Sequence, residues 1–91
     1  MNQIEQYKLV MSEIIAKQII ILGPDIAVLR ARKVPEVLLS NDWTGTVLDV
    51  KGDPDEVLNK LIDTYVELSG EIVTNALGTI FTKYPSIKRT A

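Results

Sequence analysis

Apolar residues recur at spacings of three and four along the first part of the chain, which is the spacing that places side chains on one face of a helix. The row consists of Ile4, Tyr7, Met11, Ile14 and Ile21, widened by Val10, Ile15, Ile19 and Leu22. The pattern predicts an amphipathic helix over residues 2–22. Gly23-Pro24 ends this helix, because proline lacks an amide donor and disfavours helical backbone at the residue before it.

Pro24 also suits the start of the next element, since proline is favoured in the first turn of a helix and Asp25 complements the helix dipole there. We predict a short second helix from Asp25 to Lys33, closed before Pro35. Its apolar positions are Ile26, Val28, Leu29 and Val34, and its polar positions are Arg30, Arg32 and Lys33.

The pattern changes over residues 36–51, where two apolar, partly β-branched segments flank the turn-forming run Ser40-Asn41-Asp42-Trp43-Thr44-Gly45. Asn and Asp favour turns, and Gly45 can adopt the left-handed conformation that a hairpin loop needs. The segment therefore predicts a two-stranded antiparallel hairpin. A lone hairpin is barely stable in water, so it must pack on helices or on another chain.

A long C-terminal helix is predicted to begin after Asp53, an N-cap candidate followed by Pro54 and Glu56. Its first apolar row is Leu58, Leu61, Ile62, Tyr65, Leu68, Ile72, Ala76 and Ile80, and its second row is Val57, Val66, Val73, Leu77 and Phe81. A straight helix from Pro54 to Tyr84 would be about 46 Å long. It must therefore bend at Ser69-Gly70 or extend beyond its own subunit.

Two adjacent apolar rows need cover on more than one side, and the other predicted elements are few. We therefore expect self-association, most simply an intertwined or bundle-forming homodimer. A monomer whose helices wrap tightly, with the hairpin as a lid, is the alternative. The expected fold class is α+β and mostly helical, with residues 1–84 as a single domain and 85–91 as a frayed tail. The expected interface residues are Ile14, Leu58, Leu61, Ile62, Tyr65, Leu68, Ile72, Ala76 and Trp43.

Trp43, the only tryptophan in the chain, lies at the predicted tip of the hairpin. Three interpretations are open: the ring covers a small core, anchors an interface, or stacks on a ligand or base. The interface interpretation is slightly favoured, because tryptophan is enriched among interface hot spots and a hairpin alone covers the ring poorly.

The chain contains no histidine and no cysteine. The Ser-His-Asp and Cys-His arrangements are therefore impossible within one chain, and the usual zinc sites lack their nitrogen and sulfur ligands. Phosphate-binding glycine motifs are absent as well. We interpret the acidic cluster Asp53, Asp55 and Glu56 as a helix cap rather than a cation site. We expect no enzymatic activity, with no catalytic residue, cofactor or metal.

The net charge of −2 disfavours a general nucleic-acid-binding protein. The basic cluster Arg30, Arg32 and Lys33 is the candidate anion-binding site, although such a cluster is also typical of a solvated face near a helix C-terminus. It supports an alternative function as a small-ligand or anion-sensing regulatory module and, less well, as a nucleic-acid-associated factor.

The apolar run Ile19-Ile20-Ile21-Leu22 is far shorter than the ~20 residues that span a bilayer, and the charged N-terminal residues do not resemble a signal peptide. We expect a soluble, cytoplasmic protein without a membrane partner. The function that the sequence favours is a non-enzymatic, homo-oligomeric interaction module, acting as a scaffold or regulatory adaptor. Its expected partners are a second copy of itself and another protein.

Overall fold

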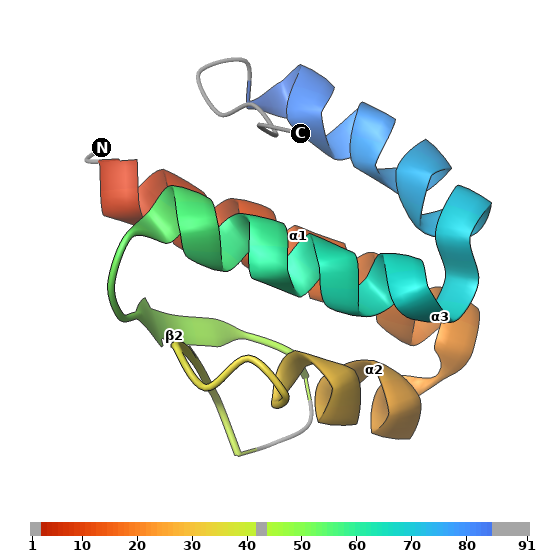
Figure 1. Ribbon diagram of the computed structural model, residues 1–91, viewed down its shortest axis with the longest axis horizontal. Coiled ribbons are helices and arrows are strands. Elements are labelled where there is room, and N and C mark those ends of the chain that lie inside the picture. Colours follow the sequence, from red (N-terminus) through yellow and green to blue (C-terminus); the bar gives the residue numbers. More distant parts are fainter. Residues whose placement is uncertain (1–2, 42–43, 85–91) are drawn as a thin grey trace.

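The computed structural model describes residues 3–41 and 44–84, with only the backbone described for residues 3, 69 and 71–76. The elements in chain order are α1 (Gln3–Leu22), α2 (Pro24–Ala31), β1 (Val37–Leu39), β2 (Val47–Val50) and α3 (Pro54–Lys83) (Figure 1). The predicted α+β, mostly helical class is confirmed. No helix in these described ranges is long and apolar enough to cross a membrane.

The helix boundaries follow the signals that the sequence provides. Gly23, with φ of 88°, separates α1 from α2, and Pro24 occupies the first turn of α2. Asp53 caps α3, because its Oδ1 accepts a hydrogen bond from the amide of Asp55 at 3.1 Å. Both local predictions are confirmed.

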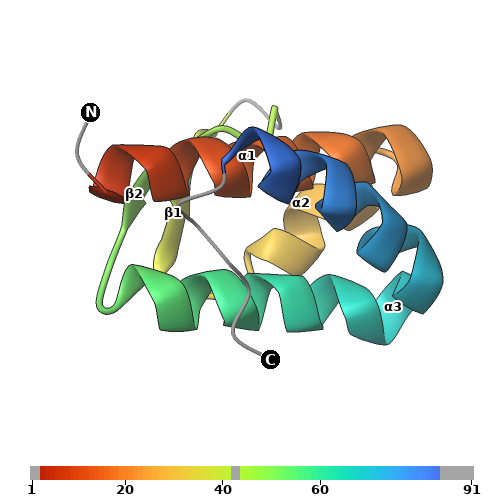
Figure 2. The same ribbon diagram turned by 90° about the horizontal axis from the view of Figure 1, so that it is seen from above.

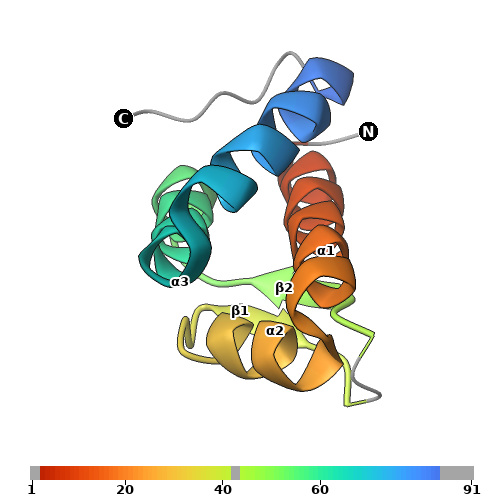
Figure 3. The ribbon, with the colours of Figure 1, turned by 90° about the vertical axis from the view of Figure 1, so that its right-hand side faces the viewer.

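The helices surround one core. α1 and the first half of α3 lie opposite each other and run in the same direction, as Figure 2 shows. Seen along these helices, α2 and the hairpin close one side of the core, and the last part of α3 crosses the other side (Figure 3). The core residues are Tyr7, Val10, Met11, Ile14, Ile15, Ala31, Val34, Val37, Val47, Val50, Val57, Leu58, Leu61, Ile62, Tyr65, Leu77 and Ile80.

α3 bends sharply at Gly70, whose φ of 35° lies in the left-handed region that glycine adopts without a Cβ clash. The molecule measures 30 × 28 × 18 Å, whereas a straight helix of this length would measure about 45 Å. The short final segment, Leu77 to Lys83, which we call the arm, therefore doubles back over α1 (Figures 1 and 2). Of the two conformations that the sequence left open, the bent one is observed.

The arm is held on α1 by burial and by charge. Leu77 and Ile80 are buried in the common core. At the end of the arm, Lys83 Nζ lies 2.6 Å from Glu13 Oε1. The Lys83 ammonium holds the pKa of the Glu13 carboxyl below its ordinary value, and Glu13 in turn raises the pKa of Lys83.

Within one chain the described members of the two apolar rows of α3 are buried or partly buried, except Leu68, which is 38% exposed. Five residues expected at a subunit interface are fully buried within their own chain: Ile14, Leu58, Leu61, Ile62 and Tyr65. The chain exposes 5159 Å², and a compact monomer of about 10 kDa exposes about 5,300 Å². An intertwined dimer is therefore not needed to cover this core, because the bend lets α3 meet α1 from two sides.

The predicted hairpin is confirmed, with β1 antiparallel to β2 and an irregularity between Leu38 and Leu39. It packs on α1, where Ser12 Oγ accepts a hydrogen bond from the Val47 amide at 3.0 Å. Gly45 lies in the loop with φ of 76°, and a Cβ there would lie 2.3 Å from Cγ2 of Ile15. Glycine is therefore required both for the backbone conformation and for the close approach to α1. Trp43, expected at the hairpin tip, lies outside the described residues.

We expect Gly45→Ala to lower the free energy of unfolding by about 2–4 kcal/mol. The cost of holding alanine in the left-handed conformation and the cost of overpacking against Ile15 both contribute. Gly52→Ala is the matched control, because Gly52 has a similar φ of 83° but nothing within 4 Å of its Cβ position. The control should lose only the stability that the backbone strain costs, about 1–2 kcal/mol. Urea unfolding of both variants checks this, and equal losses would show that the contact with Ile15 is unimportant.

We expect the Glu13–Lys83 pair to stabilise the fold at neutral pH and to lose this effect in acid. A carboxyl with a lowered folded pKa contributes stability above its ordinary pKa, here 4.5, and loses it as the pH falls through the lower folded value. Lys83→Met should therefore destabilise the protein at pH 7 and be nearly neutral once Glu13 is protonated. Urea unfolding over a pH series, with Lys51→Met as a control for lost charge, measures this. A destabilisation that stays constant down to low pH would contradict the ion pair.

Candidate functional site

The short helix α2 keeps its small side chains inside and its largest aliphatic side chains outside. Ala27, Val28 and Ala31 are fully buried, whereas Ile26 is 49% exposed and Leu29 is 53% exposed. The hydroxyl of Tyr65 in α3 donates to the Ala27 carbonyl oxygen at 2.6 Å. Burial raises the pKa of this hydroxyl, so it stays protonated and continues to donate. The alanines thus let α2 lie close to the core, and the outer face of α2 remains available.

This outer face forms one wall of a hollow of about 340 Å³, lined by Ile26, Leu29, Arg30, Lys33 and Leu68. The first four positions follow the helical spacing of three, four and seven, which places them on one face of α2 and of the turn after it. Leu68, from α3, is 38% exposed. The hollow therefore has an apolar floor with cationic side chains along its α2 edge.

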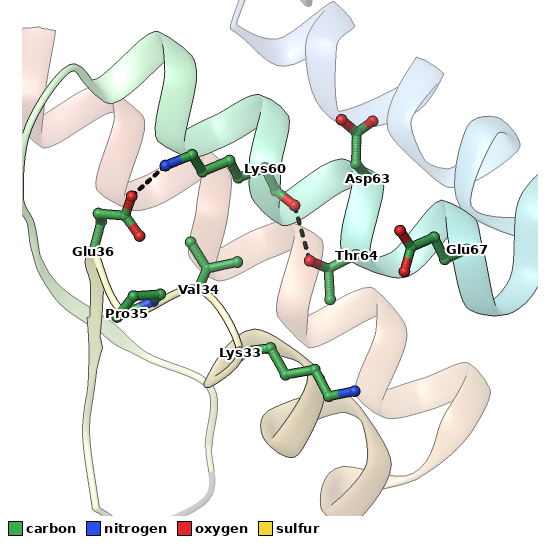
Figure 4. Close-up of a pocket in the computed structure, with 8 residues that line it drawn as sticks. All are labelled: Lys33, Val34, Pro35, Glu36, Lys60, Asp63, Thr64 and Glu67. Carbon is green, nitrogen blue, oxygen red and sulfur yellow. Dashed lines mark hydrogen bonds and ion pairs between the residues drawn. The ribbon is translucent and has the colours of Figure 1, made fainter.

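A second hollow of about 450 Å³ adjoins the first and is lined by Lys33, Val34, Pro35, Glu36, Lys60, Asp63, Thr64 and Glu67 (Figure 4). Lys33 lines both hollows, which lie between α3 and the segment formed by α2 and the turn after it, and we call the two together the α2–α3 groove. An ion pair between Lys60 and Glu36 crosses one end of it. This contact lowers the pKa of Glu36 and raises that of Lys60.

The two walls of the groove carry opposite charges. Arg30 and Lys33 lie along the α2 side, and Asp63 and Glu67 lie along the α3 side. Figure 4 shows Lys33 and Glu67 on opposite sides of the hollow. An anion placed in the second hollow would meet the carboxylates of Asp63 and Glu67 as well as Lys33, and like charges at close range repel.

The candidate anion-binding residues therefore do not form one site. Arg30 and Lys33 line the groove, whereas Arg32 is exposed and is absent from the lining of both hollows. Lys83, at the end of α3, lies apart from them and is paired with Glu13.

The residues predicted at an interface divide into three groups. Leu68 lies in the α2–α3 groove, where a partner can reach it. The five buried residues named above are already covered. The side chains of Ile72 and Ala76, like Trp43, lie outside the described part of the chain. Sequence reasoning missed Ile26 and Leu29, which it counted only as apolar positions of a short helix.

The remaining features offer less chemistry. A hollow of about 280 Å³ between α1 and the hairpin loop is lined by Leu9, Ser12, Glu13, Ala16, Thr44, Gly45 and Thr46. Its carboxylate, Glu13, is engaged by Lys83. Within the described ranges, no group of three His, Cys, Asp or Glu side chains is placed to hold a metal ion.

Comparison of the chain with protein-family models, with curated proteins and with solved structures finds no match. The functional argument consequently depends on the groove and its exposed apolar residues.

Gln18 is the one polar side chain among the described buried residues, and it is fully buried. Neither its Oε1 nor its Nε2 has a hydrogen-bond partner in the described structure. Gln18 lines none of the three hollows described above, so we do not assign it to a binding site. An unsatisfied buried polar group costs stability.

We expect Gln18→Met to raise the free energy of unfolding by about 1–3 kcal/mol, because the desolvation penalty disappears while the side-chain length is kept. Gln6→Met is the control, since Gln6 lies on the same helix, is partly exposed and has a partner. Chemical unfolding of both variants gives the comparison. A destabilised Gln18→Met protein would show that the amide has a partner in solution.

Proposed function

We propose that this chain is a non-enzymatic interaction module that self-associates through the α2–α3 groove and acts as a scaffold or regulatory adaptor. The observation that carries the proposal is the distribution of side chains on α2. Ala27 and Ala31 face the core, while the larger Ile26 and Leu29 face water. For a helix that only stabilises a monomer the opposite arrangement would bury more apolar area, so the exposed pair favours a binding role.

The size of this apolar surface supports a reversible association. Ile26, Leu29 and Leu68 are each about half exposed, so covering one of them contributes about 1 kcal/mol. Six such side chains from two copies contribute about 6 kcal/mol, and association itself costs at least about 4 kcal/mol. The difference of about 2 kcal/mol corresponds to a Kd of tens of millimolar, so we expect a weak dimer that dissociates on dilution.

The compact core supports docking of folded subunits. The residues that an intertwined bundle would share are buried within one chain. Each subunit can therefore fold alone and then associate through its surface, which is the arrangement expected of an exchangeable module. This proposal keeps the homodimer that the sequence favours and moves its contact from the α3 core rows to the groove.

The alternative, an anion-sensing or small-ligand module at Arg30, Arg32 and Lys33, has less support. Arg30 and Lys33 line one hollow without Arg32, and the adjoining hollow, which Lys33 also lines, carries the carboxylates of Asp63 and Glu67. A nucleic-acid-associated role meets the same objection, because the acidic wall repels phosphates.

We expect the molar mass to rise from monomer towards dimer as the concentration increases from about 0.1 mM to about 10 mM. Leu29→Gln should weaken the association by about tenfold or more, because each dimer loses two apolar contacts. Leu48→Gln is the matched control, since Leu48 on β2 is 57% exposed and lies outside the groove. Sedimentation equilibrium and light scattering measure the association of the wild-type chain and of the two variants.

A wild-type protein that remains monomeric over the whole range would overturn self-association. A dimer that Leu29→Gln and Leu48→Gln weaken equally would show that the contact does not lie in the α2–α3 groove.

A further inference from the structure

We infer that the occupant of the α2–α3 groove is a second copy of this chain related by a two-fold axis, with the Arg30 and Lys33 side of each copy facing the Glu67 side of the other. This inference rests on the proposed self-association and specifies its geometry. Two copies would bring their apolar residues together and set Lys33 of each copy opposite Glu67 of the other.

The first step of the argument is that the charges on the two walls are available to a partner. Lys33 and Glu67 line the same hollow. No ion pair joins them within the described structure, and Figure 4 shows their charged ends apart. By contrast, Lys60 at the end of the same hollow is already paired with Glu36. The cations on the α2 side and the carboxylate of Glu67 can therefore turn to groups outside the chain.

The second step is symmetry. A two-fold contact uses the same patch on both subunits, so that each residue pair occurs twice. A patch with a basic wall and an acidic wall is complementary to its own rotated copy, because the rotation brings the basic wall opposite the acidic wall. A different partner would need positive and negative charges in the matching arrangement. A second copy of the chain has that arrangement already, because its walls are the same.

The third step concerns the apolar floor. Ile26 and Leu29 from α2 line one hollow together with Leu68 from α3, and Lys33 joins this hollow to the one that Glu67 lines. In a two-fold contact these three side chains meet their own counterparts, which removes them from water in both copies. The floor then supplies the affinity, and the charged walls fix the orientation, which is the usual division between apolar and charged contacts at an interface.

The experiment exchanges the charges of the two walls by single substitutions at exposed positions. Lys33→Glu makes its wall less basic and places a carboxylate opposite Glu67 of the partner, and Glu67→Lys places an ammonium opposite Lys33. We expect each variant alone to self-associate at least tenfold more weakly than the wild-type chain. An equimolar mixture of the two variants, or one chain carrying both substitutions, should recover the wild-type affinity. Fluorescent labels on one variant report the mixed dimer in sedimentation velocity.

Two controls separate the specific pairing from general charge effects. Lys51→Glu changes the net charge as much as Lys33→Glu does, but Lys51 is exposed and lies outside the groove, so this variant should associate like the wild-type chain. At about 1 M salt, where the screening length falls to about 3 Å, the differences among the variants should shrink. Circular dichroism confirms that each variant is folded.

The outcomes distinguish this inference from the proposed function. A wild-type dimer that neither Lys33→Glu nor Glu67→Lys weakens would overturn the two-fold pairing and leave self-association standing. Weakened variants that fail to associate when mixed would overturn it too, because the effect would then not come from a Lys33–Glu67 contact. A wild-type chain that is monomeric at every concentration would remove the proposed function and the pairing together.

Discussion

The reversal of α3 at Gly70 is the constraint on which the rest of the molecule depends. A helix with apolar residues on two adjacent rows cannot bury both against a single straight neighbour. By turning back, α3 places its first half opposite α1 and its arm across α1. The remaining side of the core is left to α2 and the hairpin, and the chain becomes as compact as a monomer of its size.

The closure of the core decides where binding chemistry can occur. Because Tyr65 and its neighbours are fully covered, the surface of α3 that remains is the side carrying Leu68, Asp63 and Glu67. The small side chains of α2 set that helix close to the core, and the bond from Tyr65 to the Ala27 carbonyl fixes its position. The α2–α3 groove is the result, with an apolar floor that the chain itself does not cover.

Local structure was predictable from the sequence because its causes are local. Asp53-Pro54, Gly23-Pro24 and Gly45 each act through the backbone within a few residues, and the helix starts and the hairpin were predicted from them correctly. The position of the bend at Gly70 was recognised, but its direction was not, since it depends on contacts with α1 that are distant in the sequence. Counting apolar positions also could not show that the chain would return to cover its own second row.

The site was less predictable than the fold. Periodicity identifies which residues are apolar, yet α2 has apolar residues around most of its circumference, so the pattern does not say which of them are covered. The alanines at positions 27 and 31 were the available signal, because small residues four apart mark the face that approaches a neighbour closely. Leu68 was predicted as a contact residue and is exposed, although the same argument applied equally to residues that are buried.

The arm also has a consequence for the order in which the molecule assembles. Its ion pair joins residues 70 positions apart in the chain, and closing so long a loop costs more entropy than forming the local turns. Contacts between residues far apart in the chain slow folding because the loop must be closed first. We therefore expect the arm to dock late, which would leave the side of α1 beneath it exposed while the chain folds.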